Sequence, residues 1–154
     1  MTQQEATALV PAPHGGSPDE WKAWAENLSV SIAMGLRCDE IGPGHAVIRF
    51  ESDAWPLNPN GAVHGGLVAA WADHCLGIAS ATVAREGTTA ATAAMTVQYV
   101  RPAIPPLLFT AQVQRSGRTL AFITVEVTDR DGRLATIVNG TMSVDGSSRF
   151  LSTT

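Results

Sequence analysis

Residues 58–73 read NPNGAVHGGLVAAWAD, a stretch that joins a group of turn residues to the start of a long apolar segment. Asn58-Pro-Asn-Gly61 has the composition of a turn, and the segment His64-Gly65-Gly66 follows it. The apolar run 67–84 then predicts a buried helix. It contains the carboxylate of Asp73, and an unpaired buried charge is costly. This acid therefore needs a structural or a chemical explanation.

The length of 154 residues, with 45% hydrophobic and 16% charged residues, predicts one globular domain. We expect a disordered tail at 1–16, one domain at 17–146 and a C-terminal tail at 147–154. The first segment lacks the basic and apolar regions of a secretory signal. The apolar run contains Asp73 and His74 and is rich in alanine, so it fits a core helix better than a membrane span.

The two cysteines, Cys38 and Cys75, form neither a disulfide framework nor a metal-binding pattern, which favours a reducing cytoplasm. The net charge of −4 argues against nucleic acid as a partner. The charge is uneven, because residues 101–154 carry six arginines and four acids. This positive part would suit an anionic ligand, and the alternative is a set of solvated strand edges.

The first part of the domain predicts a helix and a hairpin. Ser17-Pro-Asp-Glu20 has the pattern of a capping box, and the helix that it begins would end at Gly35. Strands at 36–41 and 45–51 would flank the turn Gly42-Pro43-Gly44. The apolar face of the first helix would consist of Trp21, Trp24, Leu28 and Ile32.

After the central helix, which Gly87 would end, the apolar residues recur with the period of a strand. Four strands separated by turns and prolines predict a meander. Together with the early hairpin they would form one antiparallel sheet on which the apolar helix lies. The fold class predicted from these patterns is α+β.

The central stretch has the residues that acyl-group chemistry requires. A helix N-terminus offers free N–H groups to a developing negative charge, and glycine lets a ligand approach the backbone. His64, Gly65 and Gly66 lie where such a site would form. Asp73 would attack as a nucleophile or deprotonate a water, and Asn58 would hold that water or the thioester.

The spacing of these residues predicts a dimer. Gly65 and Asp73 are eight residues apart, which is about 12 Å along a helix. Both must approach the same reacting atoms within about 3 Å. One helix cannot achieve this, whereas two antiparallel copies place Asp73 of one chain near Gly65 of the other. We therefore expect two shared sites in a two-fold dimer.

The combined pattern of Asn58, Gly61, His64-Gly65-Gly66 and Asp73 resembles the signature of hotdog-fold acyl-CoA thioesterases, and it is most similar to the PaaI-like, phenylacetate-degradation subgroup. Related aryl-CoA thioesterases often have Glu, Gln and Thr where this chain has Asp73, Asn58 and Gly77, which favours the PaaI-like side. The resemblance covers roughly residues 30–145 and extends to Thr92, Met95, Tyr99-Val-Arg-Pro102 and residues 116–122. Ala94 stands where several relatives carry an acid.

The family implies a long central helix wrapped by a curved antiparallel sheet, here with an extra N-terminal helix. It also implies homodimers that often pair into homotetramers, and acyl-CoA hydrolysis without a metal or redox cofactor. Asp73 would be the nucleophile or general base, the Gly65 amide the oxyanion donor, and Thr92 would orient the water. The CoA phosphates would lie near Arg101, Arg118 and Thr119.

Other roles remain open for the same residues. Asp73 would be structural if it paired with His74 or with a backbone group. His64 would only cap the helix and shape the loop, and the two glycines would only let helices pack closely. Two other functions also fit the fold: an acyl-thioester dehydratase or hydratase, and a non-catalytic acyl-CoA-binding protein. Thiol release from acyl-CoAs separates hydrolysis from both.

Overall fold

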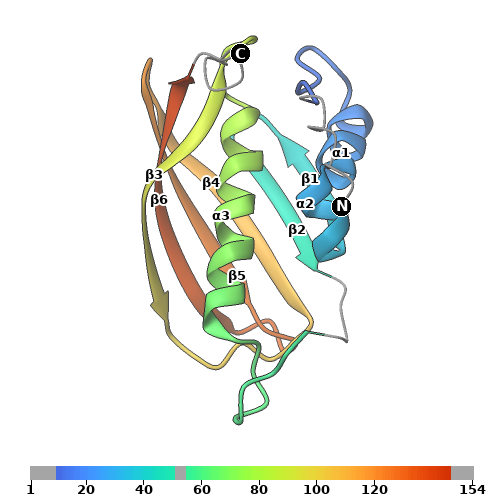
Figure 1. Ribbon diagram of the computed structural model, residues 1–154, viewed down its shortest axis with the longest axis vertical. Coiled ribbons are helices and arrows are strands. Elements are labelled where there is room, and N and C mark those ends of the chain that lie inside the picture. The colour runs from blue at the N-terminus through green and yellow to red at the C-terminus, as the bar shows by residue number, and fades with distance from the viewer. Residues whose placement is uncertain (1–9, 51–54, 147–154) are drawn as a thin grey trace, which may run out of the picture.

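The computed structural model describes residues 10–50 and 55–146, so the tail predicted at 147–154 and most of that predicted at 1–16 lie outside the described residues. The described elements, in chain order, are α1 (Pro18–Asn27), α2 (Ser29–Met34), β1 (Leu36–Gly42), β2 (His45–Phe50), α3 (Gly65–Ala81), β3 (Thr89–Tyr99), β4 (Leu107–Ser116), β5 (Leu120–Thr128) and β6 (Leu134–Gly146) (Figure 1).

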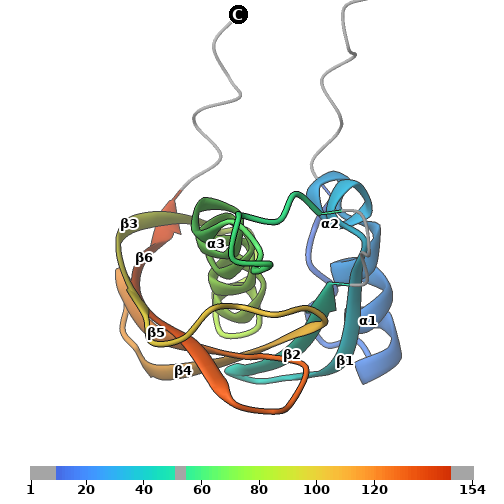
Figure 2. The same ribbon diagram turned by 90° about the horizontal axis from the view of Figure 1, so that it is seen from below.

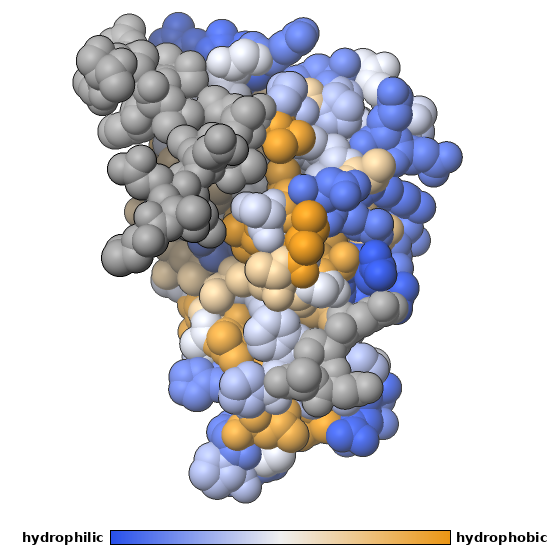
Figure 3. Space-filling model, turned by 45° about the vertical axis from the view of Figure 1, so that its right-hand side comes forward, coloured by the Kyte–Doolittle hydropathy of each residue, from blue (hydrophilic) through white to orange (hydrophobic). Residues whose placement is uncertain are grey.

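The N-terminal helix begins as predicted but is divided in two. Ser17 accepts a hydrogen bond from the Glu20 N–H at 3.3 Å, and the Glu20 carboxylate accepts one from the Ser17 N–H at 2.6 Å. At Leu28 the backbone is extended, which ends α1 and starts α2. Gly35 ends α2 with a φ of 67°. The break turns the predicted apolar face, so that Ile32 is 65% exposed. Figure 3 shows hydrophobic side chains among polar ones on one face of the molecule.

The six strands form one antiparallel sheet in the order β1-β2-β4-β5-β6-β3. The predicted hairpin of β1 and β2 is confirmed, and β4, β5 and β6 form a meander. The predicted meander of four strands is wrong, because β3 pairs with β6 and not with β4. The chain therefore places β3 at one edge of the sheet and β1 at the other.

The sheet curves around α3, which Figure 2 shows nearly end-on. Alternating residues of the strands bury their side chains toward the helix, and Trp71 and Leu76 of α3 are among the most buried side chains. Gly140 of β6 lets the two layers approach closely, because a Cβ there would overlap the Leu76 side chain. The predicted α+β fold, with a long helix wrapped by a curved sheet, is confirmed.

The central helix is shorter than predicted at its C-terminal end. Thr82 follows α3; its hydroxyl donates to the Ala79 carbonyl at 2.7 Å and accepts from the Gly44 N–H at 2.8 Å. A threonine that bonds to backbone groups in this way competes with helix continuation. Gly87 instead lies in the turn before β3, with a φ of 78°.

Candidate active site

The loop before α3 is organised by Asn58. Its Oδ1 accepts hydrogen bonds from the backbone N–H groups of Asn60 at 2.9 Å and Ala62 at 3.2 Å. Two backbone donors fix which end of the amide is the oxygen, so Nδ2 is the end that remains for a ligand. Gly61 completes the turn with a φ of 73°. Asn58 therefore shapes the loop with one end of its side chain and has a free donor at the other.

His64 is the N-cap of α3, as the sequence allowed. Its Nδ1 accepts a hydrogen bond from the Gly66 N–H at 3.0 Å. This bond places the proton of the neutral ring on Nε2. The Gly65 N–H, one residue earlier, has no hydrogen-bond partner within residues 10–50 and 55–146. The cap therefore uses one of the two glycine donors and leaves the other free.

Tyr99, at the end of β3, closes one side of this helix start. Its hydroxyl donates to the Gly65 carbonyl at 2.6 Å, and its ring lies beside the glycine. A Cβ added at Gly65 would be 3.0 Å from Tyr99 Cζ, so a glycine is the residue that fits best. The sequence included Tyr99 only as part of the family resemblance, because no local pattern indicates that a strand tyrosine reaches a helix terminus.

Asp73 lies eight residues further along α3, half-buried and facing β3. Thr92 of β3 donates its hydroxyl hydrogen bond to Asp73 Oδ1 at 2.6 Å. Within the described part of the chain, Oδ2 has no hydrogen-bond partner. The structure thus brings together two residues that the sequence selected separately, and it leaves one carboxylate oxygen free.

His74 is not the partner of Asp73. Its Nε2 lies 2.8 Å from the Ser31 hydroxyl of α2. Burial lowers the pKa of His74, and the neighbouring Asp73 carboxylate opposes this effect only in part. The structural alternative of an Asp73–His74 pair is therefore wrong, and the pairing with Thr92 replaces it.

The buried thiol of Cys75 is not an available nucleophile. Cys75 is fully buried in α3, and burial holds the pKa of its thiol well above that of an ordinary cysteine. Burial is also the main reason why the pKa of Cys38 is raised to about 11. Both cysteines are free thiols that stay protonated near neutral pH, and the reactive thiolate form is therefore rare.

The residues predicted to contact CoA lie at two opposite ends of the folded molecule. Arg101 follows β3 on the side of Gly65 and donates to the Leu134 carbonyl at 2.9 Å. Arg118 lines a surface hollow with Ala84 and Arg85, beyond the other end of α3. Thr119 is exposed in the same turn as Arg118. One chain does not bring these predicted contacts together.

Trp71 of α3 packs within a cluster of aromatic rings. Trp71 is 1% exposed and stacks on Phe50 at a ring-centroid distance of 4.8 Å. Trp55 contacts the Trp71 ring edge-on at 4.6 Å. Among the residues that the structure describes, no three His, Cys, Asp or Glu side chains converge as metal ligands would. No helix in the described ranges is long and apolar enough to cross a membrane.

A curved antiparallel sheet wrapped around one long helix defines the hotdog class of folds. A model of the thioesterase superfamily matches residues 60–136, which is half of the chain. The chain therefore belongs to the thioesterase superfamily. The match begins in the Asn58 loop and includes α3, β3, β4 and β5.

Several solved structures have the same fold. The PaaI protein of the Escherichia coli phenylacetic acid degradation operon is 25% identical, with a TM-score of 0.71 over 81% of this chain and 90% of that chain. A thioesterase family protein from Silicibacter pomeroyi is 25% identical, with a TM-score of 0.73 over 80% and 93%. A Streptococcus mutans protein bound to acetyl-CoA is 24% identical, with a TM-score of 0.65 over 73% and 90%. No match is found among curated protein sequences.

Proposed function

We propose that this protein is an acyl-CoA thioesterase, which hydrolyses a thioester to a free acid and CoA. The observation that carries the proposal is the 2.6 Å hydrogen bond from Thr92 to Asp73 Oδ1, which orients a half-buried carboxylate in a superfamily of thioesterases. CoA as the thiol part is consistent with the acetyl-CoA bound to the S. mutans protein of the same fold.

Asp73 acts through its free carboxylate oxygen. Because Thr92 occupies Oδ1, Oδ2 is the atom that removes a proton from water or attacks the carbonyl carbon itself. A C–O bond forms, the C–S bond breaks, and the electron pair leaves with the CoA sulfur, which then takes a proton. In the second route water hydrolyses an Asp73 anhydride. Both routes need the same oriented carboxylate.

The Gly65 N–H stabilises the carbonyl oxygen as it becomes negative. This donor lies at the positive end of the α3 dipole, and the His64 cap keeps the neighbouring Gly66 N–H occupied. Tyr99 holds the Gly65 carbonyl from the opposite side. His64 and Tyr99 are therefore positioning residues for this donor, and the Asn58 Nδ2 group contacts the water or the thioester.

The complete site forms between two chains. Gly65 and Asp73 lie in the same straight helix, about 12 Å apart, which is too far for one thioester carbonyl. A two-fold dimer with antiparallel copies of α3 brings Gly65 of one chain to Asp73 of the other. The exposed edge of β3, which lies beside α3, is the surface that pairs the two chains.

CoA lies along the surface of this dimer. Its phosphates are bound by residues from both ends of the sheet when the second chain is present. These are the exposed Arg118 and Thr119 at one end and Arg101 at the other. Arg85 shares the surface hollow with Arg118 and adds a second cation there. The buried free thiols Cys38 and Cys75 agree with a reducing, cytoplasmic location.

The test is the release of CoA thiol from a panel of acyl-CoAs by the wild type and by Asp73→Asn and Asp73→Ala. We expect hydrolysis by the wild type and a loss of about 10²–10⁴-fold in both variants, the range for removal of a positioned proton-transfer group. Asp19→Asn, at an exposed position of α1, is the matched control and should keep full activity. Full activity in Asp73→Ala contradicts the assigned role.

The competing functions give different results in the same samples. A hydratase removes the enoyl absorbance of crotonyl-CoA without releasing thiol, and a binding protein retains acyl-CoA without turnover. Single-turnover hydrolysis in ¹⁸O-labelled water decides between the two routes for Asp73. When the carboxylate acts as a base, the label enters only the product. Label in the Asp73 carboxylate identifies an anhydride that water opens at the aspartyl carbonyl.

A further inference from the structure

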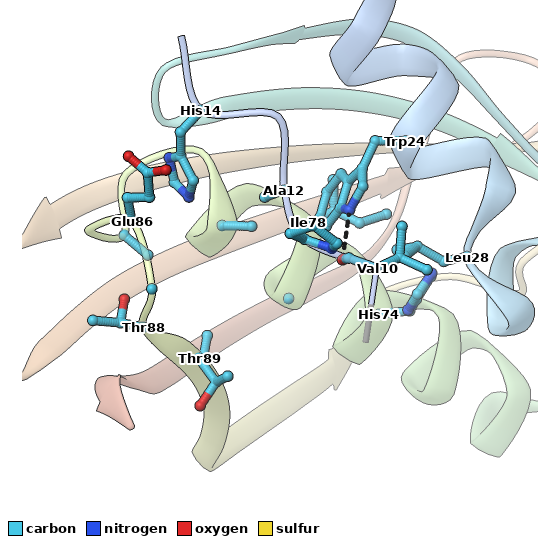
Figure 4. Close-up of a pocket in the computed structure, with 16 residues that line it drawn as sticks. Val10, Ala12, His14, Trp24, Leu28, His74, Ile78, Glu86, Thr88 and Thr89 are labelled. Atoms are coloured by element: carbon cyan, nitrogen blue, oxygen red, sulfur yellow. Dashed lines mark hydrogen bonds between the residues drawn. The ribbon is translucent and has the colours of Figure 1, made fainter. Parts of the chain in front are cut away.

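A cavity of about 490 Å³ lies next to the Asp73–Thr92 pair, between the N-terminal segment, α1, α3 and the start of β3 (Figure 4). Pockets that bind small molecules have volumes of about 300–1,000 Å³. Neither Asp73 nor Thr92 lines the cavity. His74 and Gly77, which directly follow Asp73 on the helix, do line it, and so does Ala90, two residues before Thr92 on β3. The cavity therefore begins beside the proposed reacting atoms.

The outer wall of the cavity comes from the part of the chain that precedes the superfamily match. Residues 10–14 cross the opening, and Trp24 Nε1 of α1 fixes this segment by donating to the Val10 carbonyl at 3.2 Å (Figure 4). Leu28 lies beside them. The superfamily model matches residues 60–136, so this wall is an addition to the matched region.

The inner wall consists of one face of α3 with unusually small residues. Gly77 and Ala81 lie one helical turn apart on α3 and line the cavity together with Ile78, and Ala84 lines it just beyond the end of the helix. A Cβ added at Gly77 would meet no atom within 4 Å, so its missing side chain leaves open space in the cavity. From His74 to Ala81 the helical part of this wall is about 10 Å long, at 1.5 Å per residue.

The walls are mainly apolar along most of this length. Apart from His74, the polar side chains His14, Glu86, Thr88 and Thr89 lie at the end of the cavity away from His74 (Figure 4). At the near end, burial lowers the pKa of His74 and favours its uncharged form. The cavity thus suits an elongated apolar group that enters near Asp73.

We propose that this cavity binds the acyl group of the thioester, that the substrates are medium-chain acyl-CoAs, and that residues 10–14 and Trp24 form the wall that encloses the chain. This inference rests on the proposed thioesterase function and adds its substrate class. Because Gly77 lies one turn from Asp73 and Ala81 lies two turns from it, a bulky residue at each position sets a different limit on chain length.

The experiment measures kcat/KM for acetyl-, butyryl-, hexanoyl-, octanoyl- and decanoyl-CoA in the wild type, Gly77→Phe and Ala81→Phe. The wild type should prefer the longer chains. In Gly77→Phe the value for decanoyl-CoA should fall by about tenfold or more, while acetyl-CoA is unaffected. Ala81→Phe should accept longer chains than Gly77→Phe. Ala23→Phe, on the exposed face of α1, should change neither.

Binding of decanoic acid, measured by calorimetry, separates this inference from the proposed function. Hydrolysis with the same chain-length profile in both Phe variants overturns the cavity assignment and leaves the thioesterase function standing. If no acyl-CoA is hydrolysed, the function is wrong. In that event decanoic acid that binds the wild type and not Gly77→Phe supports the cavity as an acyl site, and the absence of binding to the wild type overturns it.

Discussion

The two edges of the sheet are finished in different ways. At the β1 edge, α1 lies along the strand, and the Glu26 carboxylate accepts a hydrogen bond from the Cys38 N–H at 2.9 Å. At the β3 edge, most of the eleven residues are exposed, many of them alanine or threonine, and no other described strand pairs with the outer side. Proteins normally cover or charge such an edge.

This difference suits the dimer that we propose, in which the β3 edge would meet a second copy. The covered edge is satisfied by the chain's own helix. The open edge carries Thr92 and Tyr99, the two β3 residues that contact the candidate site. The chemistry that we propose therefore depends on the open β3 edge. Substitutions there should change activity, whereas substitutions at the β1 edge should change only stability.

The largest effect on the open side is expected for Gly65→Pro. Proline suits the first position of a helix, and the extended backbone of His64, with ψ of 130°, suits the residue before a proline. The change therefore deletes one N–H and keeps the helix start. We expect kcat/KM for acyl-CoA to fall by about 10²–10³-fold, the cost of one oxyanion donor.

Gly65→Ala is the matched control for this prediction. It adds a Cβ against the Tyr99 ring, as proline does, but it keeps the N–H. Activity in Gly65→Ala should lie much closer to that of the wild type. Equal losses in the two variants would assign the effect to the displaced tyrosine and not to the missing donor.

A smaller loss is expected for Ala93→Lys at the exposed β3 edge. If two β3 strands pair about a two-fold axis, the added positive charge occurs twice in the interface and the two charges repel each other. Lysine is common at strand edges because it prevents pairing with another chain. In dilute solution we expect the dimer to dissociate in sedimentation analysis and kcat/KM to fall by about tenfold. Ala33→Lys, exposed on α2, should do neither. A fully active monomer would show that the shared site is wrong.

At the covered edge, Glu26→Ala should change stability and not activity. It leaves the Cys38 N–H without its acceptor, which should lower the free energy of unfolding by about 1–2 kcal/mol in urea titrations. Glu26→Gln keeps an acceptor oxygen and should lose less. Activity should remain unchanged in both variants, and a loss of activity would show that the two edges are coupled.

The smallest effect concerns the pH dependence of stability through His74, which bonds α3 to α2. Burial lowers its pKa below the ordinary value of 6.5, so below pH 6.5 the unfolded chain binds the proton more readily. The free energy of unfolding should fall as the pH drops from 7.5 to 5.5. In His74→Gln, melting temperatures should depend less on pH. An unchanged slope would contradict this assignment.

Local chemistry allowed much of the fold to be predicted. The capping box at Ser17, the hairpin at residues 42–44 and the helix start after His64 depend on neighbouring residues, and the structure confirms all three. Strand order depends on contacts between distant residues. For this reason the alternation at residues 95–99 predicted the strand β3 but not its pairing with β6.

The site was predicted unevenly for the same physical reason. Asp73 was predicted as a site residue because it interrupts an apolar helix, and Gly65 was predicted because it follows a turn. Their contacts with Thr92 and Tyr99 cross from helix to strand, which no periodicity encodes. The early end of α3 at Ala81 was also missed, because Thr82 bonds there to Gly44, which is distant in the sequence. The break at Leu28 was missed as well.

The position of Gly65 and Asp73 on one helix has a consequence in genetic terms. In the proposed dimer, each copy of α3 contributes the donor to one site and the acid to the other. An Asp73→Ala chain and a Gly65→Pro chain, each inactive with itself, would form a mixed dimer with one intact and one doubly defective site. Two null alleles of this gene would then complement each other, and random mixing would restore about a quarter of the sites.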